Sequence, residues 1–260
     1  MSGLEVAAVS AGAWALGKMK EKATDVAVDF LKDKFQGSVV TRWSNHRAER
    51  FLASFVDEVC KEADVVTESA DLNVMLAKVA DGDKESSLLF DSYRRVALSA
   101  SKDLGPMIIG LQTAKIALAS RDATEEEEQI FMAAESLNDK DFREFLAWMD
   151  SARESDRTGD GYALCVNHGA EFPVLVKGGI DEARGLVEVQ PPGENSLNLV
   201  AEVGAFALKL CNVGVLSQMT QPRGHPQLPN GTNYYLLVGK ACIELAELAH
   251  RAAAAASATA

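Results

Sequence analysis

NLVAEVGAFALKL (residues 198–210) and NYYLLVGKACIEL (residues 233–245) share one pattern, and this pattern decides the predicted fold. Aligned without a gap, both begin with Asn, carry Val-Gly at the same two positions and continue into an apolar stripe at helical spacing. We interpret each copy as the second strand of a β-hairpin that runs into a helix. Gly204 and Gly239 then lie at the joints, where the absence of a side chain lets backbones approach.

The segments before each copy supply the first strand of each predicted hairpin. A helix, a hairpin and a second helix in this order are typical of a winged-helix module. A two-unit solenoid is less favoured because repeat architectures need more than two units, and chance similarity of two joints is the other alternative. The predicted strands are GLVEVQ (185–190) with SLNLV (196–200) and VLSQM (215–219) with NYYLLV (233–238), and the predicted helices begin near Glu202 and Lys240.

Helical periodicity dominates the chain before these hairpins. The clearest stripe is Trp43, Arg47, Phe51, Phe55 and Val59, which recur every four residues. Thr124 and Glu127 form a capping-box pattern at the start of a further helix. The predicted helices cover 1–36 (amphipathic), 39–62, 69–80, 84–102, 107–119 (buried), a segment from 125 and 139–152.

The predicted fold is therefore mainly α, with a helical domain followed by a winged-helix-like α+β part that holds two short β-hairpins. The helical domain covers 1–154 and the polar, Gly-containing segment 155–161 is interpreted as a linker. The winged-helix-like domain covers 162–251, and the Ala-rich tail 252–260 is expected to fray.

Composition excludes some classes of protein. Apolar residues make up 47% and charged residues 25% of the 260, so a packed core is expected and global disorder is not. The net charge is −12: residues 1–50 hold 8 basic and 6 acidic side chains (+2), and the remainder hold 18 and 32 (−14). An acidic body repels nucleic acid and anionic membranes at long range. Four isolated cysteines without a CxxC pair, and no apolar run of spanning length, predict a cytoplasmic protein with buried free thiols.

No motif predicts catalysis, a metal or a cofactor, so we expect a non-enzymatic protein. The sequence contains no GxxxxGK[ST], GxGxxG or GxSxG. Cys165 and His168 are at helical spacing but lack the partners that a metal or a nucleophile needs. The run Glu125–Glu128 cannot converge on one cation because consecutive helical residues point in different directions.

Basic side chains are the candidate interaction residues. Arg42, His46, Arg47 and Arg50 cluster near the start of one predicted helix, and share a face that could meet phosphate, anionic lipid or an acidic partner helix. Internal pairing with the chain's own acidic surface is the competing interpretation. The long Pro/Gly-rich loop 220–232, with Arg223 and His225, is a second candidate contact.

Three kinds of partner stay open, besides a homo-oligomer. The leading one is a protein. A DNA-binding regulator is the first alternative: PVLVKGGIDEARG (173–185) would be its recognition helix, with Lys177, Arg184 and Arg223 as contacts. The net charge of −3 over residues 156–260 disfavours it, because DNA-reading modules present a basic face. A membrane surface bound through residues 1–35 is the second alternative, although the polar face there is mixed in sign.

Four segments carry a likeness to a known family: KDKFQGSVVTRWSNHRAERF (32–51), SYRRVALSASKDLGP (92–106), EEEEQIFMAAESL (125–137) and GLVEVQPPGENSLNLVAEVGAFALKLC (185–211). Through them the chain resembles the abortive-infection alpha (Abi-alpha) type of bacterial protein. It departs from that pattern by adding a second hairpin and helix after Cys211. The resemblance implies a role in bacteriophage defence and no defined catalytic site, so it assigns no functional residue.

Overall fold

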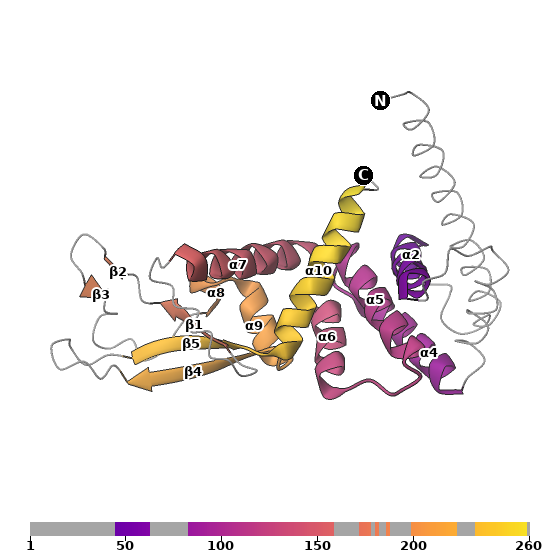
Figure 1. Cartoon of the computed structure of the whole chain (residues 1–260), viewed down its shortest axis with the longest axis horizontal. Helices are drawn as coiled ribbons and strands as arrows, with labels where there is room; N and C mark the ends of the chain where they lie inside the picture. The colour runs from indigo at the N-terminus through magenta and orange to yellow at the C-terminus, as the bar shows by residue number, and fades with distance from the viewer. Residues whose placement is uncertain are drawn as a thin grey trace, which may run out of the picture. The chain divides into compact units, whose positions relative to one another are not determined.

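The chain is mainly helical in the computed structural model, and its strands follow the first five described helices (Figure 1). This agrees with the predicted fold class. The structure describes residues 45–62, 83–158, 172–177, 180–181, 186–187, 199–222 and 232–258. The chain divides into two compact units, residues 1–123 and residues 124–260.

The first unit is organised around helix α5 (Leu104–Leu118), which is buried along almost its whole length. Its apolar side chains continue around the entire helix, and such a helix is stable only when it is covered on all sides. Helices α2 (Asn45–Glu62) and α4 (Asp83–Leu98) pack against it. The prediction of a buried helix over 107–119 is confirmed, and Pro106 lies in its first turn, where a proline costs no hydrogen bond.

Helix α2 approaches α5 so closely that a glycine is required at the crossing. A Cβ atom built on Gly110 would lie 2.4 Å from the carbonyl oxygen of Phe51 and 3.2 Å from the amide nitrogen of Phe55. The predicted stripe of α2 supplies the side chains around this contact: Phe51, Phe55 and Val59 are fully buried, and the two rings stack at 6.1 Å. Backbone-to-backbone packing at Gly110 therefore fixes the spacing of the two helices.

The second unit begins with α6 (Glu125–Ser136) and α7 (Asp139–Thr158), which both pack against α10 (Lys240–Ala258). The predicted capping box of α6 is confirmed: Thr124 Oγ1 accepts from the Glu127 amide, and Glu127 Oε2 accepts from the Thr124 amide. Helix α9 (Ala205–Asn212) also packs against α7. Phe206 of α9 meets Phe145 and Trp148 of α7 at 5.9 Å, in the tilted geometry that aromatic pairs prefer.

The sheet of the second unit has the order β1-β5-β4 and is antiparallel throughout. Strands β4 (Leu216–Pro222) and β5 (Thr232–Val238) form the second predicted hairpin, in the register Leu216 to Val238 and Pro222 to Thr232. Strand β1 (Phe172–Lys177) pairs with the other edge of β5. Leu216, Leu236 and Val238 are buried, and helix α9 packs against β4, so this helix and the hairpin share a core.

The first predicted hairpin is wrong in its second strand. Strand β3 (Leu186–Val187) pairs with β2 (Ile180–Asp181), which precedes it, and Leu199 begins the short helix α8 (Leu199–Glu202). The alternating pattern of SLNLV suggested a strand, but Leu199 is buried while Val200 is exposed on a helical turn. Tertiary packing here overrides the β preference of a short segment.

The two matching glycines consequently have different roles. Gly239 does lie at a strand-to-helix joint, but a Cβ there would meet no atom within 4 Å, so close approach is not its function. Gly204 lies between the helices α8 and α9 with φ +135°, a backbone conformation that side chains disfavour. A Cβ there would also lie 3.0 Å from the ring of Phe206. The shared Val-Gly is therefore not a structural repeat.

Other predicted boundaries also differ from the observed ones. Helix α7 continues to Thr158, into the segment predicted as a linker, and α10 continues to Ala258 with Ala252 buried, so the tail is helical rather than frayed to that point. Helices α6 and α7, predicted in the first domain, pack with α10 in the second compact unit. The predicted helices over 1–36 and 69–80 lie outside the described residues.

Candidate functional site

Two residues of the predicted basic cluster meet one aspartate of their own chain. His46 and Arg50 lie one turn apart near the start of α2, and Asp103 is the residue before α5. Asp103 Oδ1 lies 2.7 Å from His46 Nε2 and accepts a hydrogen bond from Arg50 Nε at 3.1 Å. The side chain of His46 is 51% exposed and that of Arg50 22% exposed, so solvent screens both pairs. Each pair alone therefore contributes little to the stability of the fold. These contacts tie the start of α2 to the start of α5.

Among the other predicted interaction residues, some lie within the described ranges of the chain and others lie outside them. Arg47 is partly buried on α2. Arg42, Arg184, Arg223 and His225 lie outside the described residues, as does the Cys165–His168 pair. Contact of this cluster or of the 220–232 loop with another molecule stays a prediction.

The recognition helix of the DNA-binding alternative is wrong. Its first residues lie on strand β1, which includes Lys177, and the next described residues form strand β2. The run PVLV (173–176) is apolar and holds two β-branched valines, which favours a strand. This part of the chain thus offers a sheet edge, not a helix that enters the major groove.

An exposed surface with two large apolar side chains lies on α4. We define the α4 face as Ser87, Phe90, Asp91, Arg94 and Leu98, all of which are exposed. Leu98 is 64% exposed and Phe90 38%, and the two lie on one face of the helix. Leu89, Tyr93 and Val96 cover the opposite side of α4 and are buried, and burial raises the pKa of the Tyr93 phenol.

The signal for the α4 face was present in the sequence. Phe90, Arg94 and Leu98 recur every four residues and therefore form a second stripe, offset from the buried one. The prediction of the helix depends only on the buried stripe, which includes Leu89, Tyr93 and Val96. An aromatic ring, an arginine and a leucine side by side on a helix are typical of protein-binding surfaces, where aromatic residues and Arg are enriched.

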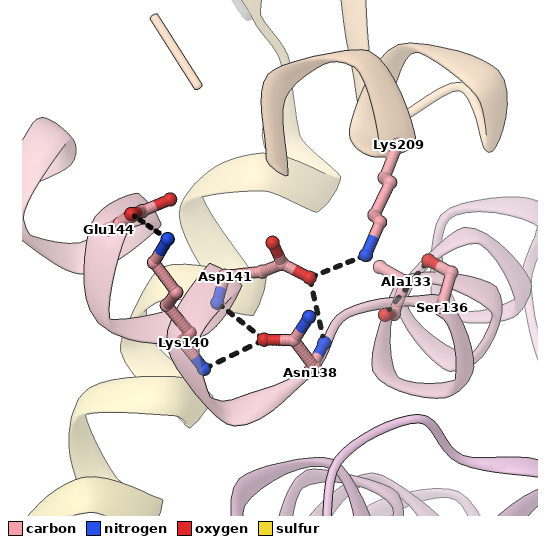
Figure 2. A network of polar contacts seen from close by, with 7 residues as sticks. All are labelled: Ala133, Ser136, Asn138, Lys140, Asp141, Glu144 and Lys209. Carbon is pink, nitrogen blue, oxygen red and sulfur yellow. Dashed lines mark hydrogen bonds and ion pairs between the residues drawn. The ribbon is translucent and has the colours of Figure 1, made fainter. Parts of the chain in front are cut away.

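A partly buried ion pair joins α7 to α9 in the second unit (Figure 2). Lys209 Nζ donates to Asp141 Oδ2 at 2.6 Å, and the Asp141 side chain is only 5% exposed. The same oxygen accepts from the Asn138 amide, while Asn138 Oδ1 accepts from the amides of Lys140 and Asp141. Asn138 and Asp141 thus cap the start of α7, and Lys209 supplies the charge that lets Asp141 be buried. This network therefore fixes the start of α7 and joins it to α9.

Among the described residues, Gln112 of α5 is a buried polar side chain that lacks hydrogen-bond partners. It is fully buried, and neither its amide nitrogen nor its amide oxygen has a hydrogen-bond partner in the described part of the chain. The neighbouring Thr113 is also buried, but its hydroxyl lies 2.8 Å from Ser92 Oγ and 2.6 Å from the Ile109 carbonyl oxygen. A buried amide without partners costs about 1–3 kcal/mol of desolvation that folding does not recover.

We therefore expect Gln112→Leu to raise the free energy of unfolding by about 1–2 kcal/mol, because leucine has a similar volume and no polar group to desolvate. Urea unfolding followed by circular dichroism measures this change. Thr113→Val is the matched control at the next position and should lower stability, because the Ser92 hydroxyl then loses its partner. A loss of stability in Gln112→Leu would contradict the assignment.

Cys211 and Cys242 are free thiols in protected places. Cys211 of α9 is partly buried and Cys242 of α10 is fully buried. Burial raises the pKa of the Cys211 thiol, and a side-chain hydrogen bond with Gln218 opposes this shift without cancelling it. The thiolate is the reactive form, so a raised pKa lowers reactivity at neutral pH.

We expect Cys211 to be alkylated more slowly in the native protein than in the unfolded one, with the midpoint of its pH profile displaced upward. Iodoacetamide labelling followed by mass spectrometry of the Cys211 peptide measures both quantities. Gln218→Leu should move the native midpoint further up, because it removes the contact that favours the thiolate. Coinciding native and unfolded midpoints would refute this prediction.

Comparison with known proteins gives no relative. No family model matches the chain, and neither a curated protein nor a solved structure matches it. Within the described ranges, no group of three or more His, Cys, Asp or Glu could hold a metal ion. No helix in those ranges is both long and apolar enough to cross a bilayer.

Proposed function

We propose that this chain is a non-enzymatic protein-interaction protein that binds another protein chain through the α4 face. The exposure of Leu98 and Phe90 beside Arg94 is the observation that carries the proposal. Burying the exposed part of two such side chains against a partner contributes roughly 25 cal/mol per Å² of apolar surface. Aromatic and Arg side chains dominate the energetics of most protein interfaces.

We further propose that the protein acts in the cytoplasm and takes part in defence against bacteriophage. The free thiols of Cys211 and Cys242 support a reducing compartment. The Abi-alpha resemblance supports the defence role. The α4 face is therefore to be tested in host cells that are challenged with phage.

The test compares three versions of the full chain in host cells. The wild type should protect the cells against phage, measured as the efficiency of plating, and should retain specific proteins in affinity purification. Leu98→Asp should lose both properties, since a carboxylate in an apolar contact must be desolvated. Val200→Asp changes another exposed apolar side chain, 49% exposed and on α8, and should behave as the wild type does. Equal protection and equal capture by all three versions would overturn the proposal.

A further inference from the structure

The α4 face carries its own complementary charges. Asp91 and Arg94 lie three residues apart on the exposed side of α4, where side chains at this spacing are neighbours. Neither side chain forms an ion pair with a residue in the part of the chain that the structure describes. The face is thus locally neutral, although the chain as a whole carries −12.

We propose that the partner on the α4 face is a second copy of this chain, with the two α4 helices antiparallel about a twofold axis. The proposal rests on the proposed function, which makes the α4 face an interaction surface. In a twofold interface, if residue i of the first copy contacts residue j of the second, then residue j of the first copy contacts residue i of the second. An axis that crosses α4 midway between Asp91 and Arg94 places each aspartate opposite the arginine of the other copy.

The apolar residues fit the same axis. Leu98 lies on the C-terminal side of Arg94, and Phe90 lies beside Asp91 toward the N-terminus. In the antiparallel arrangement the C-terminal half of one face meets the N-terminal half of the other, so Leu98 lies opposite Ser87 of the second copy and within one helical turn of its Phe90. A parallel arrangement would place Asp91 opposite Asp91 and Arg94 opposite Arg94, and such like-charge contacts are unfavourable.

Charge complementarity also favours a second copy over a strongly acidic or strongly basic partner. The long-range repulsion between two chains of −12 is screened beyond about 8 Å at physiological salt. The contact itself pairs two acids with two bases and therefore has no net charge. A strongly basic partner would meet Arg94 at the centre of the face, and a strongly acidic one would meet Asp91. One helix face buries less than a standard interface, so we expect a dimer of micromolar or weaker affinity.

Sedimentation equilibrium of the full chain over a wide concentration range tests the proposal. The wild type should move from 27.9 kDa toward twice that mass as the concentration rises. Arg94→Asp places two acids opposite two acids and should weaken the dimer about tenfold or more, and Asp91→Arg should do so with two bases. The double exchange of Asp91→Arg with Arg94→Asp restores complementary pairs and should restore the dimer.

Two variants separate this inference from its alternatives. Lys61→Asp makes the same change of charge on an exposed residue of α2 and should dimerise as the wild type does. Leu98→Asp should be monomeric. A wild-type mass of 27.9 kDa at every concentration, or a dimer that Arg94→Asp leaves unchanged, would overturn the inference. If the wild type is monomeric while Leu98→Asp still loses specific host proteins, the partner is a different protein and the proposed function stands without the second copy.

Discussion

Replacing Gly110 with alanine is expected to destabilise the first unit strongly, by about 2–4 kcal/mol, although alanine is the better helix former. The added Cβ would lie 2.4 Å from the Phe51 carbonyl oxygen and 3.2 Å from its carbonyl carbon. The atoms it meets belong to the backbone of α2, which cannot rotate away as a flexible side chain can. The helices must therefore separate, and the contacts of Phe51 and Phe55 along α5 loosen together.

Hydrogen exchange of the amides in α2 and α5 measures this effect in the unit where it arises, and the urea midpoint measures it for the chain. Gly239→Ala is the matched control, because the Cβ there meets nothing within 4 Å and its φ is not in the left-handed region. This control should be neutral or slightly stabilising, by a few tenths to about 1 kcal/mol. Equal effects of the two substitutions would show that α2 and α5 do not approach as described.

The helices around Gly110 were predictable from the sequence because their signals are local. A stripe repeated every four residues predicted the buried side of α2, and a mainly apolar run, in spite of Gln112 and Lys115, predicted the burial of α5. The Thr124–Glu127 capping box likewise depends on residues three apart. Each of these features is fixed by neighbours along one turn of helix, so periodicity is sufficient to find it.

The features that define the candidate sites depend on residues far apart in the chain. Asp103 lies 57 residues after the His46 that it contacts, and Asp141 lies 68 residues before Lys209. No spacing rule connects such positions. The failure at residues 196–200 has a different cause, because a five-residue alternating segment fits a strand and a helical turn almost equally well, and packing decides between them.

Replacing Lys209 with methionine is the second substitution with a large expected effect, a loss of about 2–4 kcal/mol. Methionine keeps the length of the side chain but removes the charge, which leaves the carboxylate of Asp141, 5% exposed, with the Asn138 amide as its remaining described partner (Figure 2). An uncompensated buried charge is more costly than the net gain from the pair, since the Asp141 carboxylate was desolvated on folding. Urea unfolding of the full chain, with the fluorescence of Trp148 near Phe206 as a local signal, measures the loss.

A double-mutant cycle then separates the ion pair from the helix cap. Asp141→Asn should cost less than Lys209→Met, because the amide oxygen can still accept from Asn138 and the Lys209 side chain is 35% exposed to water. The double variant should be more stable than the sum of the two single losses predicts, because the first substitution removes the charge that the second would leave unpaired. Lys140→Met provides the control on the same helix: its pair with Glu144 at 3.4 Å is exposed, so its removal should cost at most about 0.5 kcal/mol. If Lys209→Met costs no more than Lys140→Met, water replaces the ammonium at Asp141, and the pair does not hold α9 to α7.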